Sequence, residues 1–380
     1  MNKIEDFFLK VLQNQPKDEL QRYIRGFDKS EWQELHELSI KSGLFSAFYK
    51  RLTELNLEGP PDDFIALLQN LYFANLKRNI RLEKKMLEIM DFFRENGITA
   101  MPLKGPFMAR QIYGDIDLRR TSCDLDFLVS RTQFDEAVSV FRKAGYCPSD
   151  KKDSNRYYAF CRQIPLQKKE GNDILRIELH WDLRNIFVRT HIDEFLSAAK
   201  NIDYSGIQIM APSNEDLLLY LIFKSVFVFD TNFIDIRYLF DIHNLILKFR
   251  DCMDWEALAW KIRRFGFGLH TAYALRYSAD FFRTDIPQDF INQFRIPWLK
   301  KFLLRKTTDR RGALWSNSRA KKTYAWLFLT KSYLFSDNIF GAVKDILRKM
   351  IIAVKLLCSP HTLSAVLIAI SYYYATMVSR

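Results

Sequence analysis

Residues 97–129 read GITAMPLKGPFMARQIYGDIDLRRTSCDLDFLV, two apolar runs separated by a polar, helix-like segment. The first run, from Ile98 to Leu103, has the composition of a β-strand and ends at Lys104-Gly105. In the second run Asp124 and Asp126 alternate with apolar residues, so in a strand the two carboxylates share one face. Neighbouring carboxylates repel each other, and a fold tolerates them when a cation neutralises them. The segment therefore predicts a metal site.

A later alternating stretch, from Asp173 to Trp181, supplies a third carboxylate. Its apolar residues occupy one face of the expected strand, while Arg176, Glu178 and His180 share the other. Glu178 is therefore expected to be the third metal ligand. Such a carboxylate set is suited to nucleotidyl transfer, in which two divalent ions align the attacking oxygen with the α-phosphate and stabilise the leaving pyrophosphate. His180 is expected to act as a general base or as an orienting group, and the alternative is an ordinary buried histidine.

These motifs resemble those of the DNA polymerase β-type nucleotidyltransferase superfamily. More narrowly, the chain resembles the bacterial "nucleotidyltransferase family protein" group, which is often associated with polysaccharide and peptide gene clusters. A Lys-Gly pair in place of the more usual Gly-Ser is typical of this subgroup and of certain toxin-like relatives. Weaker likeness extends from about Trp32 to Phe282. The matching residues are Leu103-Lys104-Gly105, Tyr113, Arg119 or Arg120, Asp124-Leu125-Asp126 and Glu178-Leu179-His180-Trp181.

The resemblance implies transfer of a nucleoside monophosphate from an NTP to an acceptor, with Mg²⁺ (two ions) held by the three carboxylates. We expect a helix from about Pro106 to Tyr113, whose amino end would bind the triphosphate together with Lys104 and Gly105. Either Arg119 or Arg120 is expected to contact phosphate, and the other to form an ion pair. The sequence identifies neither the base of the nucleotide nor the acceptor.

Two other functions use the same residues. The chain could bind a nucleotide without turnover, as a scaffold or regulatory module, because a fold does not guarantee its chemistry. It could also be a toxin-like nucleotidyltransferase that modifies tRNA or protein.

Composition indicates a globular protein with polyanionic partners. The 380 residues are 48% hydrophobic and carry a net charge of +12, which favours nucleotides, nucleic acid, anionic glycans or an anionic membrane surface as partners. The five cysteines are scattered and form no C-x-x-C pair, which predicts reduced thiols in a cytoplasmic protein. The N-terminus lacks the long apolar core of a signal peptide.

The expected fold class is α+β, with a small mixed β-sheet nucleotidyltransferase core flanked by helical regions. The long amphipathic pattern from Phe64 to Glu95 predicts a helix. Capping boxes are expected at Ser30 with Gln33 and at Ser213 with Asp216. Arg237 and Asp241, four residues apart, are expected to form an ion pair or, as the alternative, to support the active site from behind. Four parts are predicted: an N-terminal helical region at 1–95, the nucleotidyltransferase core at 96–211, a helical domain at 212–299 and a C-terminal tail at 300–380.

The C-terminal tail combines a basic cluster with an apolar segment. Between Lys300 and Lys322 nine basic residues face one acidic residue, Asp309, which gives a charge of +8. The segment from Leu356 to Ser379 carries no formal charge with His361 neutral. It could span a bilayer, lie on an anionic membrane surface or dock as a terminal helix. We expect weak peripheral association with the inner membrane face; nucleic acid is the less favoured partner.

Overall fold

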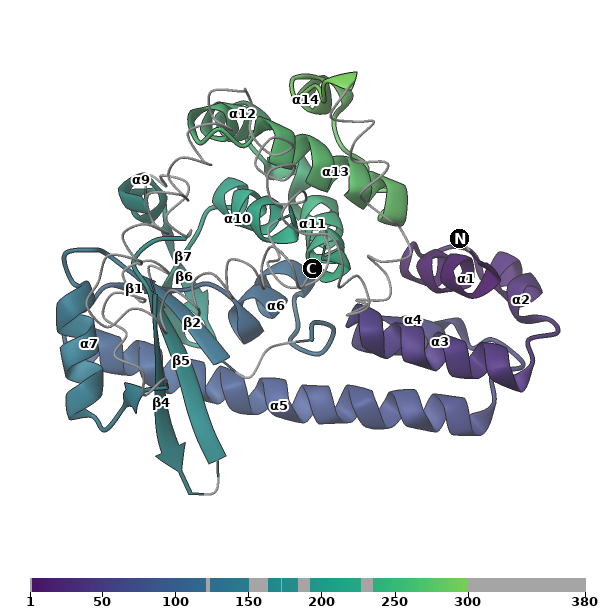
Figure 1. Cartoon of the computed structure of the whole chain (residues 1–380), viewed down its shortest axis with the longest axis horizontal. Helices are drawn as coiled ribbons and strands as arrows, with labels where there is room; N and C mark the ends of the chain where they lie inside the picture. The colour runs from purple at the N-terminus through teal and green to yellow at the C-terminus, as the bar shows by residue number, and fades with distance from the viewer. Residues whose placement is uncertain are drawn as a thin grey trace, which may run out of the picture. The chain divides into compact units, whose positions relative to one another are not determined.

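A computed structural model of the chain describes residues 2–120, 124–149, 163–171, 173–183, 192–226 and 235–298 (Figure 1). It forms two compact units. We call the first the core unit, made of Lys10–Ser39 and Gly43–Leu217, and the second the helical unit, made of Met1–Leu9, Ile40–Ser42 and Leu218–Arg380. The division into four parts stays a prediction, and the C-terminal tail lies outside the described residues.

A mixed sheet within the core unit confirms the expected α+β class. Among the described residues it has five strands, in the order β1-β2-β5-β4-β3. β2 and β5 are parallel, and the other neighbours are antiparallel. Later in the chain, β6 and β7 form a separate antiparallel pair, and β7 lies close to β1. The bounds are β1 Ala100–Pro102, β2 Asp124–Val129, β3 Cys147–Pro148, β4 Gln163–Glu170, β5 Asp173–His180, β6 Lys200–Tyr204 and β7 Ile207–Ala211.

The first strand is shorter than expected. Ile98 donates its backbone N–H to Phe93 O at 2.9 Å, so it completes the end of the preceding helix and the strand begins at Ala100. At the other end, the backbone N–H of Leu103 bonds to Asp126 O at 2.9 Å, which continues the contact with β2 after the strand has ended. This bond holds the residue that follows, Lys104, beside the Asp126 side chain.

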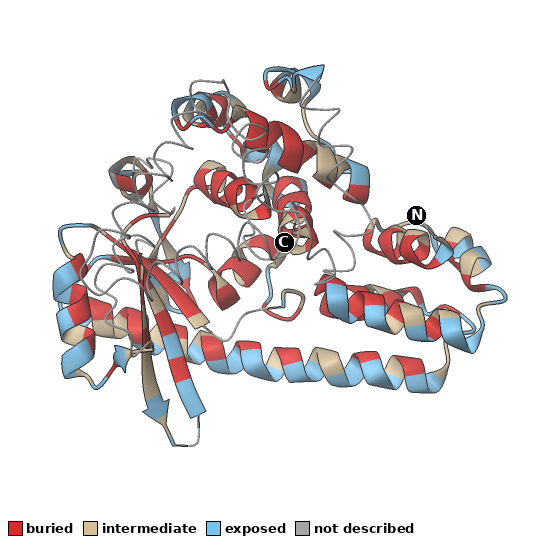
Figure 2. Ribbon diagram, in the orientation of Figure 1, coloured by how far each residue is buried: buried red, intermediate tan, exposed pale blue. Residues whose placement is uncertain are grey.

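The longest helix among the described residues, α5 (Asp62–Glu95), has 34 residues and confirms the amphipathic pattern. Its buried residues lie along one side and its exposed residues along the other (Figure 2). The helix contacts α4 (Phe45–Leu55), α6 (Gly105–Tyr113) and β1. Two polar residues, Asn75 and Asn79, fall within the buried stripe. Because a buried polar group requires a hydrogen-bond partner, these two positions mark a polar contact inside an otherwise apolar interface.

Aromatic packing joins α5 to the sheet and to α7 (Phe134–Lys143). The ring centroid of Phe93 lies 5.4 Å from that of Phe127 on β2 and 5.1 Å from that of Phe141 on α7. Edge-to-face pairs at such distances add to the free energy gained by burying the rings. This cluster lies on the face of β2 that is opposite to Asp124 and Asp126, since alternate side chains point to opposite faces.

The remaining helices of both units agree broadly with the expected series. No helix among the described residues combines the length and the hydropathy that a bilayer crossing requires. In chain order these helices are α1 Lys3–Leu12, α2 Lys17–Ile24, α3 Lys29–Ser42, α9 Ile192–Ser197, α10 Asn214–Val226, α11 Ile236–Phe249, η1 Arg250–Cys252, α12 Trp255–Arg264, α13 Gly268–Phe282 and α14 Gln288–Asn292.

Local contacts at the helix ends confirm one expectation and correct another. The Asp216 N–H bonds to Ser213 Oγ at 3.2 Å, as expected for a cap of α10. The capping box of α3 is Asp28 with Glu31, not Ser30 with Gln33, because the helix starts two residues earlier than expected, at Lys29.

The expected ion pair between Arg237 and Asp241 stays a prediction. Arg237 pairs with Asp235 at 2.5 Å, and Asp235 caps α11. Asp241 is 1% exposed, whereas the Arg237 side chain is 43% exposed.

Candidate active site

The register of two parallel strands brings the candidate residues together. Asp126 on β2 pairs with Glu178 on β5, and Leu128 pairs with His180. Paired residues in neighbouring strands point to the same face of the sheet. Asp126, Glu178 and His180 therefore project from one face, as the alternating patterns of the two segments predict.

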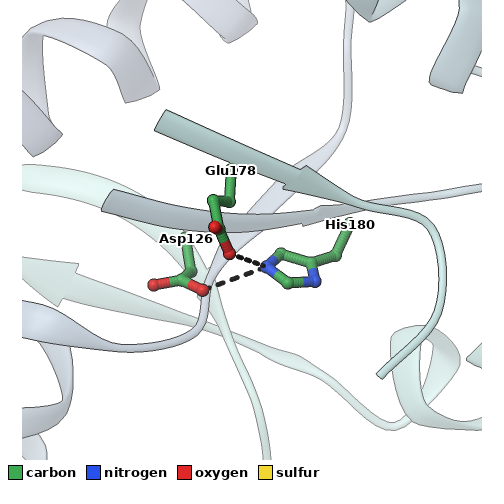
Figure 3. A group of neighbouring side chains, drawn as sticks. All are labelled: Asp126, Glu178 and His180. Atoms are coloured by element: carbon green, nitrogen blue, oxygen red, sulfur yellow. Dashed lines mark hydrogen bonds and ion pairs between the residues drawn. The ribbon is translucent and has the colours of Figure 1, made fainter. Parts of the chain in front are cut away.

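These three side chains converge (Figure 3). Each offers one ligand atom, and the three atoms lie within 4.8 Å of one another. His180 Nε2 is 3.0 Å from Asp126 Oδ1 and 3.5 Å from Glu178 Oε2. Asp126 and His180 are buried, whereas Glu178 is partly exposed. The cluster is therefore buried at Asp126 and His180 and accessible to solvent at Glu178.

Lys104 reaches the same carboxylate from another element. It is the N-cap residue of α6, and its Nζ forms an ion pair with Asp126 Oδ1. The side chain of Asp126 is 0% exposed and that of Lys104 is 18% exposed. Burial by itself would raise the pKa of the Asp126 carboxyl. The charge of Lys104 and the hydrogen bond from His180 outweigh this effect, and the pKa is held well below its usual range.

The amino end of α6 has the geometry expected for binding an anion. The Lys104 side chain makes no capping hydrogen bond to the helix, and Pro106 occupies the first turn. Gly105 has φ +66, in the left-handed region that favours glycine. The helix ends at Gly114, which has φ +80. The expected helix after the Lys104-Gly105 turn is confirmed, and the first turn of this helix directs N–H groups outward from its amino end.

Asp124 lies apart from the cluster. It is the first residue of β2 and pairs with Arg176, two positions before Asp126. Among the described residues, the group whose ligand atoms lie within 4.8 Å of one another contains Asp126, Glu178 and His180 but not Asp124. The role of Asp124 as a ligand stays a prediction.

Arg119 and Arg120 belong to the loop before β2. Arg119 is partly exposed and Arg120 is exposed. The structure does not distinguish which of them contacts phosphate. One of the aspartates of this loop, Asp117, accepts hydrogen bonds from Lys50 Nζ at 2.6 Å and from Tyr72 OH at 2.8 Å.

The residues present fit a divalent cation. Carboxylate oxygens are the ligands that Mg²⁺ prefers, and imidazole is an acceptable ligand for several divalent metals. In addition, Asp126 Oδ2 is buried and makes no hydrogen bond to any described residue. A buried carboxylate oxygen without a hydrogen bond is costly unless a cation or a water molecule satisfies it.

Sequence patterns missed the residues that support this cluster. Gln163 on β4 donates from Nε2 to Glu178 Oε2 at 3.0 Å. On α5, Asn75 and Asn79 donate to the carbonyl oxygen of Arg119 at 3.2 and 3.0 Å. Asn79 also donates to Ile116 O at 2.5 Å. The only signal in the sequence was the pair of asparagines, four residues apart, in the apolar stripe of a helix.

A second support connects α5 to α6. Glu83 on α5 receives two hydrogen bonds from Arg110 on α6, at 2.9 and 3.1 Å. Tyr204, at the end of β6, donates to Glu83 Oε1 at 2.6 Å. Burial and this carboxylate raise the pKa of the Tyr204 hydroxyl. The phenol therefore stays protonated and continues to donate this hydrogen bond.

A mixed sheet with carboxylates on neighbouring strands, beside a helix amino end, is an arrangement suited to nucleotidyl transfer. Comparison with known proteins agrees. A family model described as "Uncharacterised nucleotidyltransferase" matches residues 28–283, which is more than half of the chain. The chain belongs to this family, and the protein is a nucleotidyltransferase.

Other comparisons add little. A solution structure of the antibiotic-resistance factor ANT(2'')-Ia is similar over 54% of this chain and 95% of that chain, with 12% sequence identity and a TM-score of 0.31. A TM-score this low supports no conclusion about the site or its substrate. No curated protein matches the sequence.

Proposed function

We propose that the protein transfers a nucleoside monophosphate from an NTP to an acceptor hydroxyl or phosphate. The observation that carries the proposal is the convergence of Asp126, Glu178 and His180 within 4.8 Å, with Lys104 at the amino end of α6 bonded to the same aspartate. Carboxylates that can hold cations and a cationic helix end that can hold phosphates are the two components that this reaction requires.

Each candidate residue has a role in the proposal. Mg²⁺, as two ions, would be held by Asp124, Asp126 and Glu178, and would supply the charge that orients the α-phosphate and stabilises pyrophosphate. Lys104 and Gly105, with the first N–H groups of α6, bind the triphosphate. Arg119 or Arg120 contacts a phosphate, Glu178 helps to deprotonate the acceptor, and His180 orients this carboxylate or accepts the proton.

We also propose a cellular compartment for the protein. Cys147 and Cys252 are both exposed, which is compatible with a reducing compartment where NTP is abundant. We assign the protein to the cytoplasm, with weak peripheral membrane association through the C-terminal tail.

Pyrophosphate release from each of the four NTPs, with candidate acceptors, tests the proposal. Asp126→Asn and Glu178→Gln are each expected to lower the rate by about 100-fold or more, the range seen when a charged group that stabilises the transition state is removed. Asp173→Asn is the matched control, because Asp173 begins the same strand and pairs with Arg81 at 2.7 Å, outside the site.

The acceptor is identified by incubating the protein with labelled NTP in cell lysate. Label on a small molecule, on tRNA or on protein distinguishes the acceptor classes, and label on tRNA or protein would indicate a toxin-like enzyme. Nucleotide binding without pyrophosphate release under any acceptor would contradict the proposal and indicate a nucleotide-binding module.

A further inference from the structure

We propose that Lys104 couples nucleotide binding to metal binding, by pairing with Asp126 in the free protein and with the triphosphate in the complex. This inference rests on the proposed function, because it assigns the metal to Asp126 and the triphosphate to α6. In it, Lys104 is a competitor of the metal as well as a phosphate ligand.

The competition follows from where the charges lie. Lys104 Nζ and His180 Nε2 both contact Asp126 Oδ1. Asp126 Oδ2 remains buried on the same carboxylate, without a hydrogen bond to any described residue. A divalent ion at either oxygen would lie within a few ångströms of the ammonium group. Two cations at that separation, in a region with little solvent, repel each other strongly.

Lys104 also has a position to move to. As the N-cap residue of α6, it carries its ammonium group on a flexible four-carbon chain beside the helix amino end. A phosphate chain at that end lies within reach of this side chain. Nucleotide binding draws Lys104 away from Asp126 and leaves the carboxylate to the metal.

Thermodynamic linkage makes the effect reciprocal. If the nucleotide raises the affinity for metal by removing Lys104 from Asp126, then metal at Asp126 raises the affinity for the nucleotide by the same factor. In the absence of nucleotide, Lys104 keeps the affinity of Asp126 for metal low.

Lys104→Gln separates the two roles, since glutamine removes the charge and still offers a hydrogen bond to Asp126. Binding of Mn²⁺ alone is measured by the electron paramagnetic resonance signal of the free ion. Binding of inorganic tripolyphosphate is measured by calorimetry in EDTA. We expect Lys104→Gln to bind Mn²⁺ about tenfold more tightly, and tripolyphosphate about tenfold more weakly, than the unchanged protein.

Lys85→Gln is the matched control, because it removes a lysine that pairs with Glu88 and Glu170 in the same unit. It is expected to leave both affinities unchanged. Lys104→Arg, which keeps the charge, is expected to bind Mn²⁺ as weakly as the unchanged protein, and serves as the second variant if Lys104→Gln folds poorly by circular dichroism.

The outcomes distinguish this inference from the proposed function. If Mn²⁺ binding depends on Asp126, as tested with Asp126→Asn, but Lys104→Gln binds Mn²⁺ no more tightly, the coupling is refuted and the metal site stands. If Lys104→Arg binds Mn²⁺ more tightly than the unchanged protein, the coupling is also refuted. If Mn²⁺ binding is absent or insensitive to Asp126→Asn in every variant, both the coupling and the proposed metal site are refuted.

Discussion

The side chain of Glu178 is held in place by a hydrogen bond from a residue that sequence patterns did not reveal. Gln163 donates to Glu178 Oε2, the oxygen that also faces His180. A carboxylate with three possible rotamers of similar energy holds a cation poorly, and a fixed hydrogen bond selects one of them. Gln163 is therefore a positioning residue for Glu178.

Replacing Gln163 by methionine, which has a similar volume and no amide, should weaken Mn²⁺ binding by about tenfold, at the lower end of the range for groups that orient a metal ligand. Electron paramagnetic resonance of Mn²⁺ measures this directly. Gln167→Met is the control, since Gln167 lies on the same face of β4, four residues along, and pairs with Arg176. Equal losses in the two variants would show that the effect comes from the strand and not from the hydrogen bond.

The path of the loop before β2 is fixed by hydrogen bonds from two residues on one face of α5. Asn75 and Asn79 are 2% and 0% exposed, and between them they bind the carbonyl oxygens of Ile116, Asp117 and Arg119. These three carbonyls belong to the loop that carries Arg119 and Arg120. The orientation of α5 therefore sets the path of the chain just before the candidate metal ligands.

We expect Asn79→Ala to lower the free energy of unfolding by about 2–3 kcal/mol, because the Ile116 carbonyl loses its side-chain donor and the Arg119 carbonyl keeps only the one from Asn75. Urea denaturation measures this change. If the loop also positions a phosphate-binding arginine, the KM for NTP should rise more than kcat falls.

Asn70→Ala is the control, since Asn70 is exposed on the same helix. Surface substitutions of this kind usually change stability by less than about 0.5 kcal/mol. A similar change in both variants would mean that the loss reflects helix propensity and that the hydrogen bonds to the loop contribute little.

The sequence predicted the parts of the site that depend on local geometry. Alternation along β2 and β5 located Asp126, Glu178 and His180, because side chains of a strand change face at every residue. It did not reveal that Lys104 pairs with Asp126 or that Gln163 holds Glu178. Those contacts depend on how α6 and β4 pack beside the two strands, and nothing in the local pattern encodes such packing.

Acid stability of the whole chain depends in part on a buried imidazole in the helical unit. His243 is 9% exposed, and its ring nitrogen Nδ1 lies 3.0 Å from Thr284 Oγ1. Burial lowers the pKa of His243 from 6.5 to about 4. The unfolded chain therefore binds a proton before the folded protein does, and stability falls as the pH decreases from about 6.5 to about 4.

A shift of this size corresponds to about 3 kcal/mol across that pH window. Denaturation with urea at a series of pH values should show a smaller loss of stability for His243→Gln than for the unchanged protein. His36→Gln is the comparison, because His36 is only partly buried and the smaller lowering of its pKa by burial predicts a smaller effect in the same direction. If His243→Gln has the same pH dependence as the unchanged protein, other groups account for the acid sensitivity.

Association of the whole chain with membranes is expected to depend on its C-terminal tail. Cations near an anionic surface contribute about 1 kcal/mol each, and salt screens this contribution. Deleting residues 356–380 should reduce flotation with anionic liposomes, because lipid needs the apolar segment as well as the basic cluster. High salt should reduce it too. Equal flotation with and without the segment, or none by either form, would refute the membrane prediction.

Asn75, Asn79 and Glu83 on α5, which bind the loop before β2 and α6, also determine how much of the gene must stay together. A coding fragment that begins at residue 96 would specify the strands and all three carboxylates, but neither Asn75, Asn79 nor Glu83. Recombination that moved such a fragment into another gene would leave the loop before β2 without the helix that holds it in place. The smallest fragment of this enzyme that recombination could transfer intact therefore starts before α5. Recombination breakpoints between the genes of relatives should accordingly lie upstream of residue 62.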